Sequence, residues 1–144
     1  MILKGHLVEH RFIYNEKPVA ASRPRVTYKG TYTAKPYREY KEKMKLWASR
    51  TFKPMEGAVD IHIYFYMPIP KSLSKKKQDE LNGTFHIKKG DIDNYIKSCL
   101  DSIDGYAFND DGQVAQIFAN KKYSYTPRTE ICIKQLDLDN KVCI

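Results

Sequence analysis

One segment, residues 59–66, constrains the fold of this chain more than any other. Its odd positions, from Val59 to Phe65, are apolar, whereas its even positions carry polar or amphipathic side chains. A period of two residues is typical of a β-strand with one buried face. Pro68 and Pro70 then end the strand, because proline cannot donate a hydrogen bond to a neighbouring strand. We therefore expect a sheet that packs one face against a core.

Further strands and helices are predicted on both sides of this segment. Strands are expected at residues 7–14, 106–108, 113–125 and 129–136, with a short hairpin at 26–33. A polar helix is expected at residues 74–82. The 144 residues, of which 42% are hydrophobic, suffice for one core. We therefore predict one α+β domain over residues 1–144, in which two or three helices flank a largely antiparallel sheet.

Two more helices are predicted from apolar side chains at helical spacing. The first follows Thr33, which can cap it, and its spaced side chains are Tyr37, Tyr40, Met44 and Trp47. The second ends before Gly105, and its apolar stripe consists of Ile92, Ile96, Cys99, Leu100 and Ile103. We expect both stripes to lie in the core, and the aromatic one is better explained by packing than by base stacking.

Charge is distributed unevenly along the chain, which has a formal net charge of +8. Residues 1–53 carry 13 basic and 4 acidic side chains, whereas residues 91–111 carry 6 acidic side chains and Lys97 as their one basic residue. A basic surface around a compact acidic site suits a polyanionic substrate, because the surface attracts phosphates that carboxylates alone would repel. A solvated basic face is the alternative, and net charge does not separate the two.

The cysteines and the hydropathy indicate where the protein works. Cys99, Cys132 and Cys143 are far apart and form no C-x-x-C pair, so neither a disulfide framework nor a zinc site is predicted. No segment approaches the roughly 20 apolar residues of a membrane span, and the N-terminus does not resemble a signal peptide. We expect a cytoplasmic protein with no membrane partner.

The most distinctive local sequence starts at Gly90. Asp91 and Asp93 would face nearly opposite ways on one helix, so they can converge only if Asp91 lies just before the helix. Gly90 makes such a bend easy. Asp93 and Lys97 are four residues apart and would share a helical face that leaves both open to an exposed site.

A second acidic sequence, Asn109-Asp110-Asp111-Gly112, follows this helix. If that turn returns beside the start of the helix, three or four carboxylates meet, as a hard cation such as Mg²⁺ requires. The expected chemistry is in-line attack of a metal-activated water on a phosphodiester, with Lys97 offsetting charge on the phosphate or positioning the water. Alternatively, Asp93 and Lys97 form only a helical ion pair worth about 0.3–0.5 kcal/mol, and the acidic sequence is only a turn. Spacing alone favours this alternative slightly.

The sequence does not match other common catalytic and binding motifs. An EF-hand loop begun at Asp91 would need Gly at its sixth position and Glu at its twelfth, where Ile96 and Ser102 stand. The chain has no Walker A, G-x-G-x-x-G, G-x-S-x-G or H-E-x-x-H sequence. We therefore expect no calcium sensing and no nucleotide cofactor.

These acidic sequences resemble the RusA family of Holliday junction resolvases. The family pattern D-x-D-N-x-x-K matches residues 91–97, D-x-[IL]-x-G matches 101–105, and D-D-x-Q-V matches 110–114. The resemblance implies a RusA-like fold and a homodimeric, Mg²⁺-dependent endodeoxyribonuclease, with Mn²⁺ as a substitute, that makes paired nicks in four-way junctions during DNA recombination and repair. Such enzymes are often encoded by prophages.

The resemblance also assigns roles to single residues. It implies that Asp91, Asp93 and Asp111 bind the metal and that Lys97 is the catalytic lysine. Asp110 is equally well explained as a further metal ligand or as a turn residue. Asn94 can cap the helix or hold a ligand. Asp101, four residues after Lys97, can pair with it, as support for the site or as a surface contact.

DNA contacts are expected from basic residues near the acidic site. Lys88 and Lys89 are the best placed, although Gly90 stands where family members often carry a bulkier or basic residue. The further candidates, each equally well explained as a solvated side chain, are Arg23, Arg25, Lys75, Lys76 and Lys77. A non-catalytic DNA-binding module with a structural acidic turn is the alternative function. An RNA-binding or RNA-cleaving protein is a third hypothesis, which the eleven tyrosines permit but no RNP-type motif supports.

Overall fold

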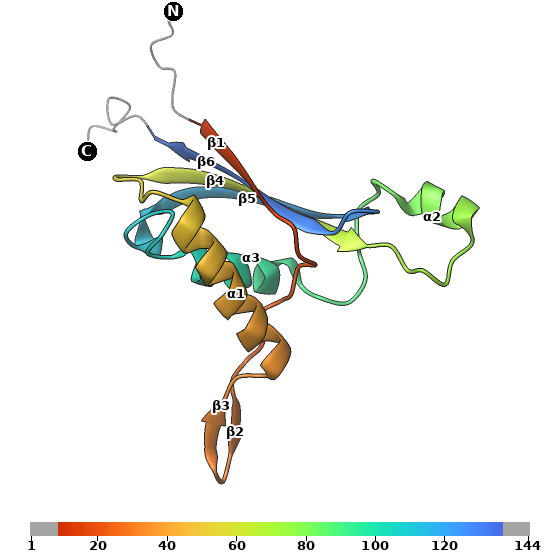
Figure 1. Cartoon of the computed structure of the whole chain (residues 1–144), viewed down its shortest axis with the longest axis horizontal. Coiled ribbons are helices and arrows are strands. Elements are labelled where there is room, and N and C mark those ends of the chain that lie inside the picture. Colours follow the sequence, from red (N-terminus) through yellow and green to blue (C-terminus); the bar gives the residue numbers. More distant parts are fainter. Residues whose placement is uncertain (1–8, 137–144) are drawn as a thin grey trace, which may run out of the picture.

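The computed structural model describes residues 9–136, and it has the predicted α+β architecture (Figure 1). In chain order, the elements are β1 (Glu9–Tyr14), β2 (Arg25–Thr27), β3 (Gly30–Tyr32), α1 (Lys35–Thr51), β4 (Val59–Pro68), α2 (Lys75–Leu81), α3 (Ile92–Ile103), the 3₁₀ turn η1 (Asp111–Gln113), β5 (Val114–Ser124) and β6 (Arg128–Gln135). Residues 7 and 8 of the first predicted strand, and Cys143, lie outside the described residues.

Four strands form the main sheet in the order β1-β6-β4-β5. The pairs β1–β6 and β6–β4 are antiparallel, whereas β4 and β5 are parallel, with Ile61 opposite Ile117. The sheet is thus largely antiparallel, as predicted. Figure 1 shows α1 and α3 together on one face of this sheet.

The core lies between β4 and these two helices. Val59, Ile61 and Ile63 are fully buried on β4, which confirms the alternation that predicted this strand. Met44 of α1 and Cys99 of α3 are buried opposite them, and burial raises the pKa of the Cys99 thiol above its usual value. Within residues 9–136, no helix is long and apolar enough to cross a membrane.

One prediction about the helices was wrong and another was right only in part. Residue Ala34, not Thr33, is the N-cap of α1, and no side chain caps this end. On α3, Cys99 and Ile103 of the predicted stripe are buried, and Ile96 and Leu100 pack against the core, whereas Ile92 is 36% exposed. The buried positions also include Tyr95 and Ser102. Ser102 tolerates burial because its hydroxyl donates to the Ser98 carbonyl at 2.7 Å.

The strand predicted at residues 106–108 is a turn. Gly105 has φ +85°, which lets the chain reverse as soon as α3 ends. The backbone N–H groups of Tyr106 and Ala107 then donate back to the carbonyl of Ile103, at 3.0 and 2.9 Å. This turn keeps the acidic residues that follow close to the C-terminal end of α3.

Candidate active site

The first group of predicted site residues surrounds the N-terminal end of α3. Asp91 is the N-cap, with extended backbone, and Asp93 lies in the first helical turn. Both side chains are exposed. This arrangement confirms that Asp91 lies just before the helix. The bend is made by Gly90, which has φ +111° and whose carbonyl accepts a hydrogen bond from Lys121 Nζ at 2.6 Å.

Lys97 lies on the exposed side of α3, one turn after Asp93. Its Nζ is 3.2 Å from Asp101 Oδ2, and 62% of its side chain is exposed. The Tyr37 hydroxyl donates to the same oxygen at 3.2 Å. Burial and the nearby Asp101 raise the pKa of Tyr37 to about 12, so the hydroxyl stays protonated at neutral pH. The sequence alone leaves a helical ion pair between Asp93 and Lys97 as the alternative to a catalytic role. Among the described residues, no ion pair joins these two side chains, and Lys97 pairs with Asp101 instead.

A second acidic group lies at the C-terminal end of α3. Asp104, the C-cap, Asp110 and Asp111 each offer an oxygen, and these oxygens lie within 4.8 Å of one another. Burial, together with the charges of Asp111 and Asp110, raises the pKa of Asp104. Because nearby carboxylates repel one another and supply hard oxygen ligands, this group suits a divalent cation such as Mg²⁺. Asp104 was not a predicted site residue.

Gln113 holds the second group in place. Its Oε1 accepts hydrogen bonds from the backbone N–H groups of Asn109 and Asp110, at 2.8 and 2.9 Å. Its Nε2 donates to the carbonyls of Met55 and Gly57, both at 2.8 Å. Sequence reasoning gave Gln113 no role, although the Asp-x-x-Gln spacing of residues 110–113 is the signature of a capping box, and the structure has one here.

The two groups lie at opposite ends of one helix. α3 has 12 residues, which at about 1.5 Å per residue separates its ends by roughly 18 Å. The acidic turn therefore does not return beside the start of the helix within the chain. It stays at the far end because the backbone folds back on Ile103 and because Met55 N–H donates to the carbonyl of Ala107 at 2.9 Å.

Comparison with known proteins assigns the chain to a nuclease family. The sequence model described as "Endodeoxyribonuclease RusA" matches residues 15–134 and so includes both acidic groups. The chain belongs to the RusA family. It is also 33% identical over 134 residues to "Uncharacterized protein YqaN" of Bacillus subtilis (strain 168), an alignment that covers 86% of this chain and 94% of that protein. RusA membership implies endodeoxyribonuclease activity, and the acidic groups agree with the metal dependence typical of RusA enzymes.

The basic residues proposed to contact DNA lie in three exposed segments of this RusA domain. Lys88 and Lys89 are exposed in the loop that leads to Asp91. Arg23 and Arg25 are exposed at the start of the β2–β3 hairpin. The third segment is α2, on which the candidate residues Lys75, Lys76 and Lys77 are exposed. Lys75 is partly engaged within the protein, since its Nζ lies 3.1 Å from Asp79 and 4.5 Å from the centroid of the Tyr125 ring.

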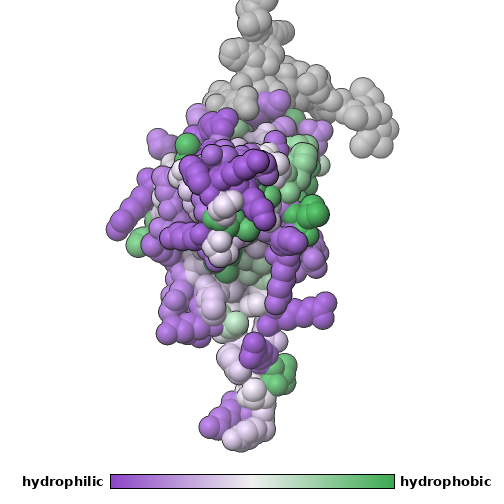
Figure 2. Space-filling view, turned by 90° about the vertical axis from the view of Figure 1, so that its right-hand side faces the viewer, coloured by the Kyte–Doolittle hydropathy of each residue, from purple (hydrophilic) through white to green (hydrophobic). Residues whose placement is uncertain are grey.

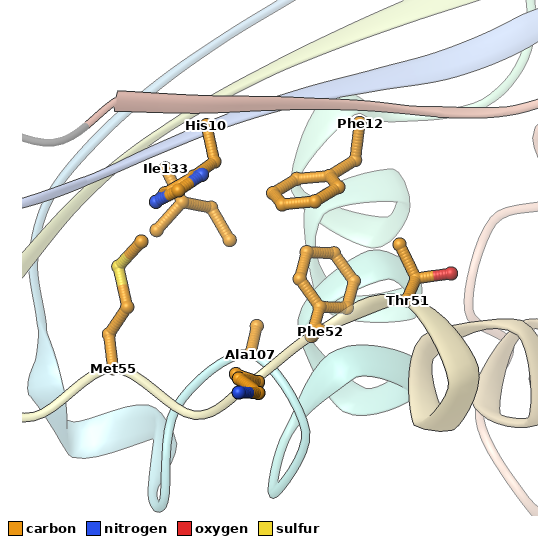
Figure 3. Close-up of a pocket in the computed structure, with 8 residues that line it drawn as sticks. His10, Phe12, Thr51, Phe52, Met55, Ala107 and Ile133 are labelled. Carbon is orange, nitrogen blue, oxygen red and sulfur yellow. The ribbon is translucent and has the colours of Figure 1, made fainter.

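A pocket of about 270 Å³ has none of the acidic residues in its lining (Figure 3). His10 and Phe12 extend into it from β1, Ile133 from β6, and Phe52 and Met55 from the segment after α1. Its eight lining residues include no carboxylate and are mostly apolar. The pocket therefore supplies no carboxylate ligand for a metal ion.

Proposed function

We propose that this protein is a Mg²⁺-dependent endodeoxyribonuclease that resolves four-way DNA junctions by paired, symmetric nicks in recombination and repair. The observation that carries the proposal is the match to the RusA family over residues 15–134, which contain exposed carboxylates at both ends of α3. The basic side chains around these carboxylates support a polyanionic substrate.

The proposed metal ligands are Asp91, Asp93 and Asp111, with Asp110 as a further ligand. Bound Mg²⁺, or Mn²⁺ in its place, would supply a water of lowered pKa and would stabilise charge on the scissile phosphate. Lys97 is the proposed catalytic lysine. Its ammonium group is exposed and is held by Asp101, so it can stabilise charge that develops on the phosphate oxygens.

A homodimer offers a way to unite ligands that are roughly 18 Å apart in one protomer, a separation that follows from a rise of about 1.5 Å per residue over α3. β5 is an edge strand, and Ile117 and Phe118 near its middle are 43% and 48% exposed. β5 begins after η1 and reaches Lys121, which contacts Gly90. Antiparallel pairing of two β5 strands would therefore bring Asp111 of one protomer toward Asp91 of the other.

Such a two-fold dimer also suits the proposed substrate. A four-way junction is itself nearly two-fold symmetric, and two symmetric nicks are needed to separate it into duplexes. A two-fold protein presents two identical sites to the junction. Lys88 and Lys89, next to Asp91, are proposed to bind phosphates of the cleaved strand, and the basic residues of α2 are proposed to bind a flanking arm of the junction.

The decisive test incubates the purified protein with a labelled four-way junction and with a linear duplex of the same sequence, with and without Mg²⁺. We expect symmetric nicks in the junction only, and only with Mg²⁺. Asp93→Asn should abolish cleavage while binding persists, and Glu42→Gln, which changes an exposed acid on α1, should cleave normally. Binding without cleavage under any divalent metal would instead favour a non-catalytic DNA-binding module.

A further inference from the structure

We propose that the hairpin formed by β2 and β3, with the residues that lead into it, is a DNA-binding arm that recognises the branch point of the junction. We define the arm as residues 23–32. This inference rests on the proposed function and extends it, because it assigns the preference for branched over linear DNA to a surface outside the acidic groups.

The first argument is charge. Residues 17–38 contain no acidic residue, so the arm lies in the middle of a segment whose charged side chains are all basic. The basic residues of this segment are Lys17, Arg23, Arg25, Lys29, Lys35 and Arg38. A segment of one sign of charge attracts a polyanion and disfavours pairing with a second copy of itself.

The second argument is exposure of apolar and aromatic side chains. Every residue of β2 and β3 is exposed, with Val26 at 80%, and Tyr28 in the turn between the two strands is 95% exposed. Figure 2 shows the arm as a narrow projection below the body of the protein. A two-stranded hairpin is only marginally stable by itself in water. An arm of this kind gains stability when a partner covers its apolar side chains.

The third argument is position. The segments on either side of the arm both bond to α3, which carries Asp93 and Lys97. Before the arm, Ala21 N–H donates to the carbonyl of Asn94 at 2.8 Å. After it, the hydroxyl of Tyr37 on α1 bonds to Asp101. DNA held at the N-terminal end of α3 would therefore lie within reach of the arm.

Shape and chemistry together identify the ligand. A two-stranded ribbon is narrow enough to enter a DNA groove or the open centre of a junction. Arg23, Arg25 and Lys29 can bind phosphates, and the Tyr28 ring can stack on a base that lacks a neighbour. Linear duplex has no such base except at its ends. Tyr28 should therefore contribute to junction binding more than to duplex binding.

The test measures equilibrium binding of the full chain to a labelled four-way junction and to a linear duplex, in EDTA so that no cleavage occurs. Tyr28→Ala should weaken junction binding by about tenfold or more, as expected for loss of one stacked base, and should change duplex binding little. The triple variant Arg23→Ala/Arg25→Ala/Lys29→Ala should weaken binding to both DNAs and lower the salt slope by about 3.

A matched control removes the same charge elsewhere. Lys45→Ala/Arg50→Ala/Lys53→Ala changes three exposed basic residues outside the arm and should retain junction binding within about threefold of wild type, because it keeps all the proposed phosphate contacts. If the arm variants bind junction as tightly as this control, the arm is not a DNA-binding element. If they become monomeric, the arm is a protein contact instead, and the inference is overturned. A wild-type protein that binds the junction but never cleaves it would refute the proposed function and leave the arm testable.

Discussion

The ammonium group of Lys97 lies 3.2 Å from Asp101 Oδ2, one helical turn further along α3. Tyr37 donates to the same carboxylate oxygen, so α1 and α3 together fix the position of Asp101. The lysine is thereby held on the side of the helix that also carries Asp93. In the proposed mechanism Asp101 is a positioning residue, because it would act on the phosphate only through Lys97.

Asp101→Asn should lower kcat for junction cleavage roughly tenfold, since Lys97 loses its charged partner and samples more conformations. Tyr37→Phe keeps that charge and should have a smaller effect. Single-turnover cleavage with saturating enzyme measures both, and junction binding should be unchanged in both. Wild-type rates for Asp101→Asn would show that Lys97 does not need this partner.

Gly90→Ala should destabilise the protein by about 2–3 kcal/mol and impair cleavage, because it combines positive φ with a steric clash. An added Cβ would lie 2.6 Å from the hydroxyl oxygen of Tyr95, a buried side chain. Gly83 is the matched control, since its φ is +86° and nothing lies within 4 Å of an added Cβ. Gly83→Ala should cost about 1 kcal/mol and leave cleavage intact. Urea unfolding gives both values, and equal costs would contradict the clash.

Gln113→Glu should destabilise the protein by about 2–4 kcal/mol, because the carboxylate loses both donors to Met55 and Gly57 and leaves those carbonyls unpaired. It also adds negative charge beside Asp110 and Asp111. Gln135→Glu removes a single donor, to the carbonyl of Glu56, and should cost about 1 kcal/mol. Thermal and urea unfolding compare the two. A similar loss in both variants would show that the four bonds of Gln113 do not act together.

Glu130→Gln should lower the free energy of unfolding by about 1–3 kcal/mol at pH 7. Burial acts to raise the pKa of Glu130, but hydrogen bonds and charges of Arg128 and Arg11 outweigh it and bring the pKa below its ordinary value of 4.5. A depressed pKa means that the ionised form stabilises the fold above pH 4.5 and that this stabilisation is lost as the pH falls through the folded-state pKa.

The difference between wild type and Glu130→Gln should therefore shrink in acid, which urea unfolding at pH 7 and at pH 3–4 would reveal. Glu39→Gln is the control, because Glu39 forms an exposed pair with Lys35 at 3.7 Å. Its effect should stay below about 0.5 kcal/mol at any pH. A difference for Glu130 that does not depend on pH would mean that packing, not charge, accounts for its effect.

Mixing two inactive variants tests the proposed dimer. Asp93→Asn and Asp111→Asn should each be inactive alone. In a mixed dimer, one shared site carries both substitutions and the other carries neither, so nicking of a single strand should reappear at up to half the wild-type rate per dimer. Sites contained within one protomer would stay inactive in every mixture. Gel analysis of the nicked junction distinguishes these outcomes.

Sequence reasoning succeeded where local rules decide the structure. The alternation at residues 59–66 predicted β4, and Gly90 before Asp91 predicted the bend before α3. It failed where contacts across the fold decide. No sequence pattern near Asp104 predicts that its side chain lies close to Asp110. That proximity depends on how the turn after Ile103 closes. The segment from Tyr106 to Phe108 was predicted to be a strand. The backbone N–H groups of Tyr106 and Ala107 instead donate to the carbonyl of Ile103 within that same turn.

The length of α3 has a consequence for control of the enzyme. A helix of this length does not bend enough to bring Asp91 and Asp111 of one chain together. If the proposed dimer forms the site, cleavage activity depends on protein concentration. Dilution below the dissociation constant of the dimer would then abolish cleavage without any inhibitor. A single protomer on linear duplex would then bind DNA without cutting it, and cleavage would be confined to places where two copies meet on one DNA.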